Sequence, residues 1–311
     1  MAPKQTWTPK EAVGKVPLSV RKDLRDNWES VKGEHEGKIS ATLGKQYVIN
    51  FNALEVYPYT EETQGFSNGP LGNIFAGYAQ CLVDAVERFV EEYGEDGKLH
   101  FNEAVTNGEF TLNVNESGID ASVIGCEVKG GTYRILFRYD CLGYNQSTIY
   151  ETMLTAIDSV PREGFPVEIK ASVTTYWDGG AEDVRQAIGE ILAMPDVVID
   201  PNFEENYAAM KGGKPTSVDW KEKFANVTLE YFNGGVKAQL DRQGFKDDDL
   251  LQEGLAEVLT SKTFKLRIVE TMKTPGIHET FFEDGICYIQ TTVENWEYNL
   301  PSVGEGLVDS L

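Results

Sequence analysis

The stretch EAVTNGEFTLNVNE, residues 103–116, recurs as EVLTSKTFKLRIVE, residues 257–270. Both stretches contain an alternation of apolar and polar residues that begins at Phe110 and at Phe264. The similarity extends outward, because residues 81–157 align on residues 235–311 without a gap. The identical pairs are Arg88/Arg242, Glu103/Glu257, Thr106/Thr260, Phe110/Phe264, Leu112/Leu266, Glu116/Glu270, Gly131/Gly285, Ile135/Ile289, Tyr144/Tyr298, Asn145/Asn299 and Glu151/Glu305.

This internal similarity predicts a tandem duplication. The period is far longer than that of a solenoid repeat, so each copy is expected to be a whole domain. Upstream of the gapless alignment, Trp28 matches Trp177 and Tyr57 matches Tyr207. A polar stretch, Pro-Arg-Glu-Gly at residues 161–164, follows a predicted helix and resembles a linker. We therefore expect a first repeat over residues 1–160 and a second over residues 161–311.

Each copy has the same predicted order of elements, α-β-α-α-β-β-β-α. The long helix is the clearest element, because its apolar residues recur at three- and four-residue spacing between Phe75 and Tyr93. Period-two alternation in the later strands favours an antiparallel sheet with one wet face. A capping box at residues 148–151, and again at residues 302–305, predicts a final helix in both copies. The expected fold is therefore α+β, with two copies arranged about a pseudo-twofold axis.

Composition and charge exclude several function classes. The chain has 311 residues, of which 41% are hydrophobic and 25% charged, which is ordinary for globular proteins. A formal net charge of -22 repels nucleic acid phosphates and anionic membranes, so we expect neither partner. No apolar run approaches the roughly 20 residues that a membrane helix needs, and the first residues lack a signal-peptide pattern.

The cysteines point to a reducing compartment. Their positions do not match between the copies, as the positions of a disulfide framework would, so we expect free thiols in a cytoplasmic protein. Asn-x-Ser/Thr sequons at Asn115, Asn145 and Asn226 leave open a secreted form whose signal peptide has been removed. The cysteines are Cys81, Cys126, Cys141 and Cys287.

Two stretches resemble motifs that carry chemistry, and each also has a structural interpretation. Residues 65–69 match the G-x-S-x-G nucleophile elbow, but a polar linker rather than a strand precedes them, which favours a simple loop. Residues 92–103 resemble a degenerate EF-hand loop, with Gly94 where a calcium ligand should stand, which favours a helical corner. With three histidines and no C-x-x-C, G-x-G-x-x-G or P-loop pattern, the sequence predicts no metal site and identifies no cofactor.

The matched polar and aromatic residues remain as candidate ligand contacts. Tyr144-Asn145 and Tyr298-Asn299 follow the last predicted strand of each copy, where Asn also favours a turn. Trp28, Trp177, Tyr57 and Tyr207 are aromatic anchors that could also stack on a ligand ring.

The sequence leaves three functions open. The first is a binding or carrier protein that holds a small, largely apolar or aromatic ligand in an α+β pocket. The second is an enzyme that uses tyrosine and carboxylate acid–base chemistry in the same pocket. The third is an assembly or interaction protein, and self-association falls in this class. If a ligand binds, we expect the pocket between the sheet and the long helix, with Tyr144 and Tyr298 at equivalent rims. The second copy should have the larger cavity, because it has Thr291 where the first copy has Phe137.

Overall fold

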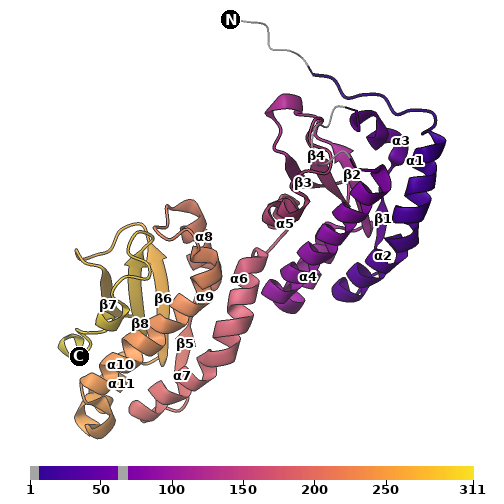
Figure 1. The fold of residues 1–311 in the computed structure, drawn as a ribbon. Coiled ribbons are helices and arrows are strands. Elements are labelled where there is room, and N and C mark those ends of the chain that lie inside the picture. The colour runs from indigo at the N-terminus through magenta and orange to yellow at the C-terminus, as the bar shows by residue number, and fades with distance from the viewer. Residues whose placement is uncertain (1–6, 62–68) are drawn as a thin grey trace, which may run out of the picture. The chain divides into compact units, whose positions relative to one another are not determined.

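The computed structural model describes residues 7–61 and 69–311. The chain divides into two compact units, Met1–Val167 and Glu168–Leu311, and each has its own mixed four-stranded sheet (Figure 1). We call them the N-terminal unit and the C-terminal unit. Both are α+β, as the sequence predicts.

In the N-terminal unit, one helical run holds two α-helices joined by a π-helical turn, Leu24–Glu29. The remaining helices and strands follow in the predicted order, with a short helix before the long one. The elements are α1 (Leu18–Asp23), α2 (Ser30–Leu43), β1 (Val48–Asn50), α3 (Ala53–Val56), α4 (Leu71–Ala104), β2 (Glu109–Val114), β3 (Ile124–Lys129), β4 (Thr132–Phe137) and α5 (Ile149–Asp158).

The C-terminal unit also opens with a helical run that contains a π-helical turn, Val173–Trp177. A second π-helical turn, Tyr231–Lys237, interrupts its long helix between α9 and α10. The elements are α6 (Val167–Ser172), α7 (Asp178–Ile191), β5 (Val198–Asp200), α8 (Phe203–Gly212), α9 (Trp220–Glu230), α10 (Ala238–Arg242), α11 (Asp249–Val258), β6 (Thr263–Val269), β7 (His278–Glu283) and β8 (Ile286–Thr292).

The two sheets have the same topology. Their strand orders are β1-β2-β4-β3 and β5-β6-β8-β7. In each sheet the first three strands of this order run parallel, and the last pairs antiparallel with its neighbour. The expectation of an antiparallel sheet was therefore wrong. Period-two alternation reports that one sheet face is covered and the other is wet, and it carries no information about strand direction.

The strand registers also correspond. Phe110 pairs with Tyr133 between β2 and β4, and Phe264 pairs with Cys287 between β6 and β8. Both residues of the second pair lie 154 positions after those of the first. The same difference of 154 relates Ile124–Phe137, between β3 and β4, to His278–Thr291, between β7 and β8. The pairing thus follows the gapless sequence alignment.

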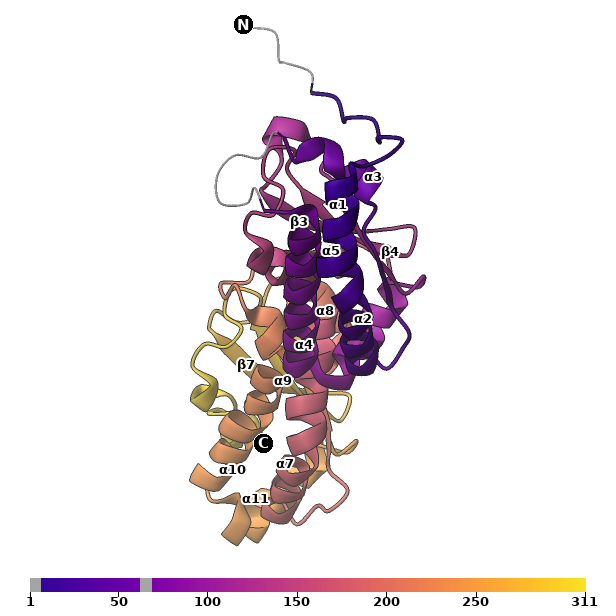
Figure 2. The same cartoon turned by 45° about the vertical axis from the view of Figure 1, so that its right-hand side comes forward.

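In the N-terminal unit, helices cover one face of the sheet, and the core lies between them. Figures 1 and 2 show α2 beside α4, and α5 lies against β3. The apolar stripe of α4 is buried as its spacing predicts, with Phe75, Tyr78 and Leu82 fully enclosed. Near the far end of α4, Phe101 packs on Phe110 of β2 and Tyr133 of β4, which lie on the buried face of the sheet.

The structure supports the helical interpretation of residues 92–103 over a calcium loop. These residues lie inside α4, which is kinked at Gly94, where φ is +58°. The predicted order has a short helix after the long one; in the N-terminal unit the end of α4 takes its place, whereas the C-terminal unit has the separate helix α11.

The final helix forms in one unit only. In the N-terminal unit α5 begins after Thr148, but the Thr148 side chain makes no capping bond and instead donates to the Asn145 carbonyl at 2.8 Å. In the C-terminal unit the matching segment forms 3-10 turns, Leu300–Ser302 and Val308–Ser310. Both capping-box predictions were therefore wrong.

Composition explains why the second of these helices is missing. Pro301, Gly304 and Gly306 stand where the N-terminal unit has Ser147, Tyr150 and Thr152. Each of the two glycines would lie inside the helix, where glycine costs about 1 kcal/mol relative to alanine. Gly304 has a φ of +90°, which is outside the helical region.

Two of the identical pairs have one shared structural role. Gly131 and Gly285 turn the β3–β4 and β7–β8 hairpins, with φ of +81° and +79°. A Cβ at either glycine would lie 2.2 Å from Thr106 Oγ1 or 2.1 Å from Thr260 Oγ1. Only glycine fits beside these threonines, so both identical pairs serve folding.

A candidate ligand site in the C-terminal unit

The predicted aromatic contacts are mainly packing residues. Trp28 is 2% exposed and stacks on Phe51, with ring centroids 5.4 Å apart. Trp177, on the matching π-helical turn, is half-buried and meets Phe203 and Phe232 edge-on.

The two matched tyrosines upstream of the long helices are also half-buried. Tyr57 lies in a 3-10 turn, Tyr57–Tyr59, and Tyr207 lies on α8. Tyr207 packs against the rings of Trp220 and Phe224, with centroids 6.0 Å and 6.4 Å away. None of these four aromatic residues lines either of the two surface pockets described below.

The paired asparagines have a backbone role in both units. Asn145 and Asn299 adopt left-handed conformations, with φ of +49° and +47°, which asparagine tolerates better than most residues. The carbonyl of each accepts the backbone N–H three residues on, at Thr148 and at Ser302. The preceding tyrosines differ, because Tyr144 is half-buried whereas Tyr298 is 52% exposed.

The structure places Thr291 in the core of the C-terminal unit, beside a group of buried polar atoms. Thr291 is fully buried, pairs with His278 across β7 and β8, and donates to the Ile277 carbonyl at 3.1 Å. The Tyr231 ring meets the His278 ring edge-on, with centroids 5.4 Å apart. Thr228 precedes Tyr231 by one helical turn on the same side of the long helix.

Several of these buried atoms lack hydrogen bonds within the described chain. They are His278 Nδ1, the hydroxyls of Tyr231 and Thr228, and Trp296 Nε1. The Tyr231 hydroxyl is close enough to Thr291 and to the Glu297 backbone for an electrostatic effect, but its hydrogen-bond geometry is poor. Buried polar groups without partners are costly, which makes this part of the core a candidate for bound water or ligand; among the described residues of the N-terminal unit, His35 Nδ1, His100 Nδ1 and the Tyr133 hydroxyl also lack partners.

His278 has a defined protonation pattern. Its Nε2 contacts the Tyr298 carbonyl at 2.5 Å, and a carbonyl can only accept, so Nε2 carries the proton. Burial lowers the pKa of His278 below its ordinary value of 6.5, so the ring is neutral at pH 7. Nδ1 is then a bare acceptor without a donor in the described residues.

A pocket of about 370 Å³ lies beside this cluster and includes His278 in its wall. Its other lining residues come from the start of β7 and from the segment that follows β8. They are Ile277, Thr280, Asn299, Ser302, Glu305, Gly306 and Ser310. The segment that matches α5 does not form a helix, and its residues Glu305, Gly306 and Ser310 line the pocket. Of the predicted site residues, Asn299 lines the pocket, Tyr298 contacts His278 through its carbonyl, and Thr291 pairs with His278.

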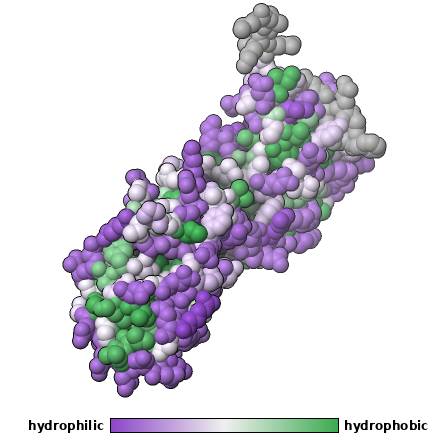
Figure 3. Space-filling view, turned by 90° about the vertical axis from the view of Figure 1, so that its left-hand side faces the viewer, coloured by the Kyte–Doolittle hydropathy of each residue, from purple (hydrophilic) through white to green (hydrophobic). Residues whose placement is uncertain are grey.

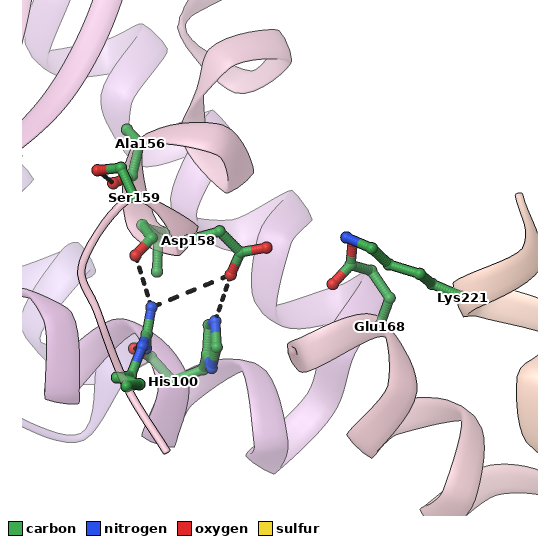
Figure 4. Close-up of polar contacts among 8 residues, drawn as sticks. His100, Ala156, Asp158, Ser159, Glu168 and Lys221 are labelled. Carbon is green, nitrogen blue, oxygen red and sulfur yellow. Dashed lines mark hydrogen bonds and ion pairs between the residues drawn. The ribbon is translucent and has the colours of Figure 1, made fainter. Parts of the chain in front are cut away.

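His278 is half-buried, whereas the N-terminal unit has two buried histidines, His35 and His100, and His100 lies in a different setting. His100 Nε2 lies 2.7 Å from Asp158 Oδ1, and Arg162 donates to the His100 carbonyl at 2.6 Å (Figure 4). The nearby Ser159 hydroxyl donates to the Ala156 carbonyl at 2.7 Å, so it is not positioned as a nucleophile activated by His100. This group ties the end of α4 to the end of α5 and has no catalytic geometry. Figure 4 also shows the Glu168–Lys221 ion pair of the C-terminal unit, at 2.9 Å.

The other sequence candidates have limited chemistry. Most of the G-x-S-x-G stretch, residues 65–68, lies outside the described residues. The four cysteines are free thiols, and burial raises the pKa of each, which disfavours the reactive thiolate.

Within the described ranges, no group of three or more His, Cys, Asp or Glu side chains could hold a metal ion. Residues 7–61 and 69–311 contain no helix with the length and apolarity needed to cross a membrane.

On the surface, hydrophobic residues form separate patches among hydrophilic ones on the face drawn in Figure 3.

Comparison of the chain with protein-family models, with curated proteins and with solved structures finds no match.

Proposed function

We propose that this protein is a small-molecule binding or carrier protein and that its ligand occupies the His278 pocket of the C-terminal unit. The observation that carries the proposal is the coincidence of an open pocket with the buried, unsatisfied polar cluster around His278. Ligand sites combine a concave, partly apolar wall with a few fixed polar groups, and the volume falls in the usual range of about 300–1,000 Å³.

The chemistry of the wall refines the ligand class expected from sequence. A largely apolar ligand was expected, but the wall carries an amide, three hydroxyls and the Glu305 carboxylate besides His278. We therefore propose a ligand with several hydrogen-bonding groups. The His278 ring in the pocket wall, held edge-on by the buried Tyr231 ring, also suits a planar or aromatic portion of the ligand.

The π-helical turn at Tyr231–Lys237 supports the same location. Such turns are rare and are common at functional sites, because the extra residue re-aims a side chain. This turn begins at Tyr231 and packs on the 3-10 turn that carries Ser302. Gly235 allows the close approach, since a Cβ there would lie 2.8 Å from the Val303 Cβ.

Acid–base catalysis is the weaker alternative. Burial raises the pKa of Tyr231, so its phenol stays protonated and cannot act as a base near neutral pH. The burial-lowered pKa of His278 suits a hydrogen-bond acceptor more than a proton donor. These features favour binding.

We further infer that the two units arose by tandem duplication and that the protein works in the cytoplasm. Support for duplication comes from the shared strand order, the matching registers and the recurring hairpin glycines. Support for a reducing compartment comes from the four free thiols.

Native mass spectrometry of the full chain tests the binding proposal. Protein purified without denaturant should carry an added mass that is lost on denaturation. Ser302→Phe should fill the pocket and reduce the bound fraction at least tenfold, whereas the matched control Thr148→Phe, in the N-terminal unit, should not. An absence of bound mass, together with no binding from a metabolite extract, would contradict the proposal, as would equal retention by both variants.

A further inference from the structure

The N-terminal unit contains a separate pocket of about 310 Å³ at the carboxyl end of β2. It lies beside the part of β2 that follows Thr111, where the pairing with β1 ends, and residues from both faces of the sheet line it. In sheets with parallel strands, ligands commonly bind outside the carboxyl ends of those strands. The His278 pocket and its proposed ligand play no part in this second site.

One side of the pocket offers spare hydrogen-bond donors. Arg134 Nε donates to Asn113 Oδ1 at 3.2 Å, and Arg134 Nη1 pairs with Glu127 at 2.6 Å. Asn113 Oδ1 also accepts from Thr111 Oγ1 at 2.8 Å, which fixes the orientation of the amide. Within the described residues, Arg134 Nη2 and Asn113 Nδ2 make no hydrogen bond, so two donors remain for a carboxylate.

The same pocket offers spare acceptors. Glu116 lies just beyond β2, is exposed, and makes no ion pair or hydrogen bond within the described part of the chain. Glu55, on α3, accepts one bond from Asn52 at 2.7 Å and has a second oxygen available. Lys10 also lines the pocket, so its wall carries two cations, Lys10 and Arg134, and two carboxylates, and a ligand with charges of both signs matches it better than a simple anion or cation.

Apolar side chains complete the wall. Val56, Leu112 and Val114 line the pocket together with the charged groups. A ligand that matches all three features has a carboxylate, an ammonium and a small hydrocarbon side chain. We propose that the N-terminal unit binds a small zwitterion of the aliphatic α-amino acid class, with its carboxylate at Arg134 and Asn113 and its ammonium at Glu116 and Glu55.

The C-terminal unit has different chemistry at the matching positions. Arg267 stands in place of Asn113 and Tyr288 in place of Arg134. There the Arg267 guanidinium lies over the Tyr288 ring, 3.5 Å from its centroid, and so occupies the equivalent sheet surface. The zwitterion site is therefore specific to the N-terminal unit.

Isothermal titration calorimetry of the full chain with L-leucine, 4-methylpentanoate and 3-methylbutylamine tests this proposal. The three probes share a branched hydrocarbon chain, but the second lacks the ammonium and the third lacks the carboxylate. L-leucine should bind saturably, with at least tenfold higher affinity than either single-charge probe. Glu116→Gln should weaken L-leucine binding about tenfold, whereas the exposed control Glu91→Gln should leave it unchanged.

Three outcomes would overturn the proposal: no L-leucine binding up to its solubility limit, equal affinity for all three probes, or full affinity in the Glu116→Gln variant. Circular dichroism of each variant checks that the fold is retained. Glu116 is exposed and has no partner in the described chain, so its replacement should not unfold the unit.

Discussion

The two units share a strand order but differ at one place in their cores. Where β3 meets β4, the N-terminal unit pairs Ile124 with Phe137, and Leu142 lies buried after the strand. At the same register the C-terminal unit pairs His278 with Thr291. Trp296 takes the position of Leu142. At this register the N-terminal unit therefore has hydrocarbon side chains where the C-terminal unit has polar ones, although the strand pairing is the same.

This difference coincides with the loss of one helix. Helix α5 covers β3 in the N-terminal unit, whereas the matching segment, with Pro301 and Gly304, forms 3-10 turns. The uncovered end of β7 leaves the His278 pocket. At this place the N-terminal unit has hydrocarbon in its core, and the C-terminal unit has a pocket with polar groups in its wall.

Exchange of Phe137 and Thr291 between the two units is the sharpest test of this comparison. Phe137→Thr removes a fully buried ring and should lower the free energy of unfolding of the N-terminal unit by about 3–5 kcal/mol. The reverse change, Thr291→Phe, should cost the C-terminal unit only about 1–3 kcal/mol and should abolish ligand retention. Urea denaturation monitored by tryptophan fluorescence measures the first effect and native mass spectrometry the second. Equal costs in both directions would show that the two cores are equally tight.

The hairpin glycines test what the units have in common. Gly131→Ala and Gly285→Ala each place a Cβ against a threonine at positive φ, so each should cost about 2 kcal/mol. The cost should be the same in both units within error, as judged from thermal unfolding. A large difference would mean that the two hairpins are not equivalent.

The stability of each unit should depend on pH through one of its histidines. Burial lowers the pKa of His35 in the N-terminal unit and of His278 in the C-terminal unit. A lowered pKa means that the unfolded chain takes up the proton first, so stability falls as the pH drops below about 6.5 and levels off beneath the folded-state pKa. His278→Gln should remove this loss from the C-terminal unit alone, and His35→Gln from the N-terminal unit alone. Urea midpoints measured from pH 8 to pH 5 would contradict the assignment if His278→Gln left the profile of its unit unchanged.

The smallest expected effect concerns the open sheet faces. Glu127–Arg134 is an ion pair with side chains 18% and 39% exposed for Arg134 and Glu127, respectively. At the matching positions, Phe281 and Tyr288 have ring centroids 5.6 Å apart. Arg267 lies over Tyr288 at 3.5 Å. The coupling free energies of the Glu127–Arg134 pair and of the Arg267–Tyr288 contact should each be about 0.5–1 kcal/mol, as measured by a double-mutant cycle. Salt at 1 M should weaken the ion pair more strongly than the Arg267–Tyr288 contact, and equal salt dependence would refute this distinction.

The sequence by itself determined the mixed α+β character and the layout of each unit. Apolar spacing defined the buried stripe of α4, and alternation defined the two faces of β2 and β6, because these periods follow directly from helix and strand geometry. It also marked the neighbourhood of the site, since the contrast between Phe137 and Thr291 is visible without coordinates.

Strand direction, the missing helix and the pocket itself were decided only by tertiary structure. β4 lies between β2 and β3, and this order makes it parallel to β2, an arrangement that local pattern does not encode. His278 carried no signal in the sequence, because a lone histidine acquires meaning only from its neighbours. Its partners Tyr231, Thr291 and Tyr298 come from separate elements, and long-range packing alone brings them together.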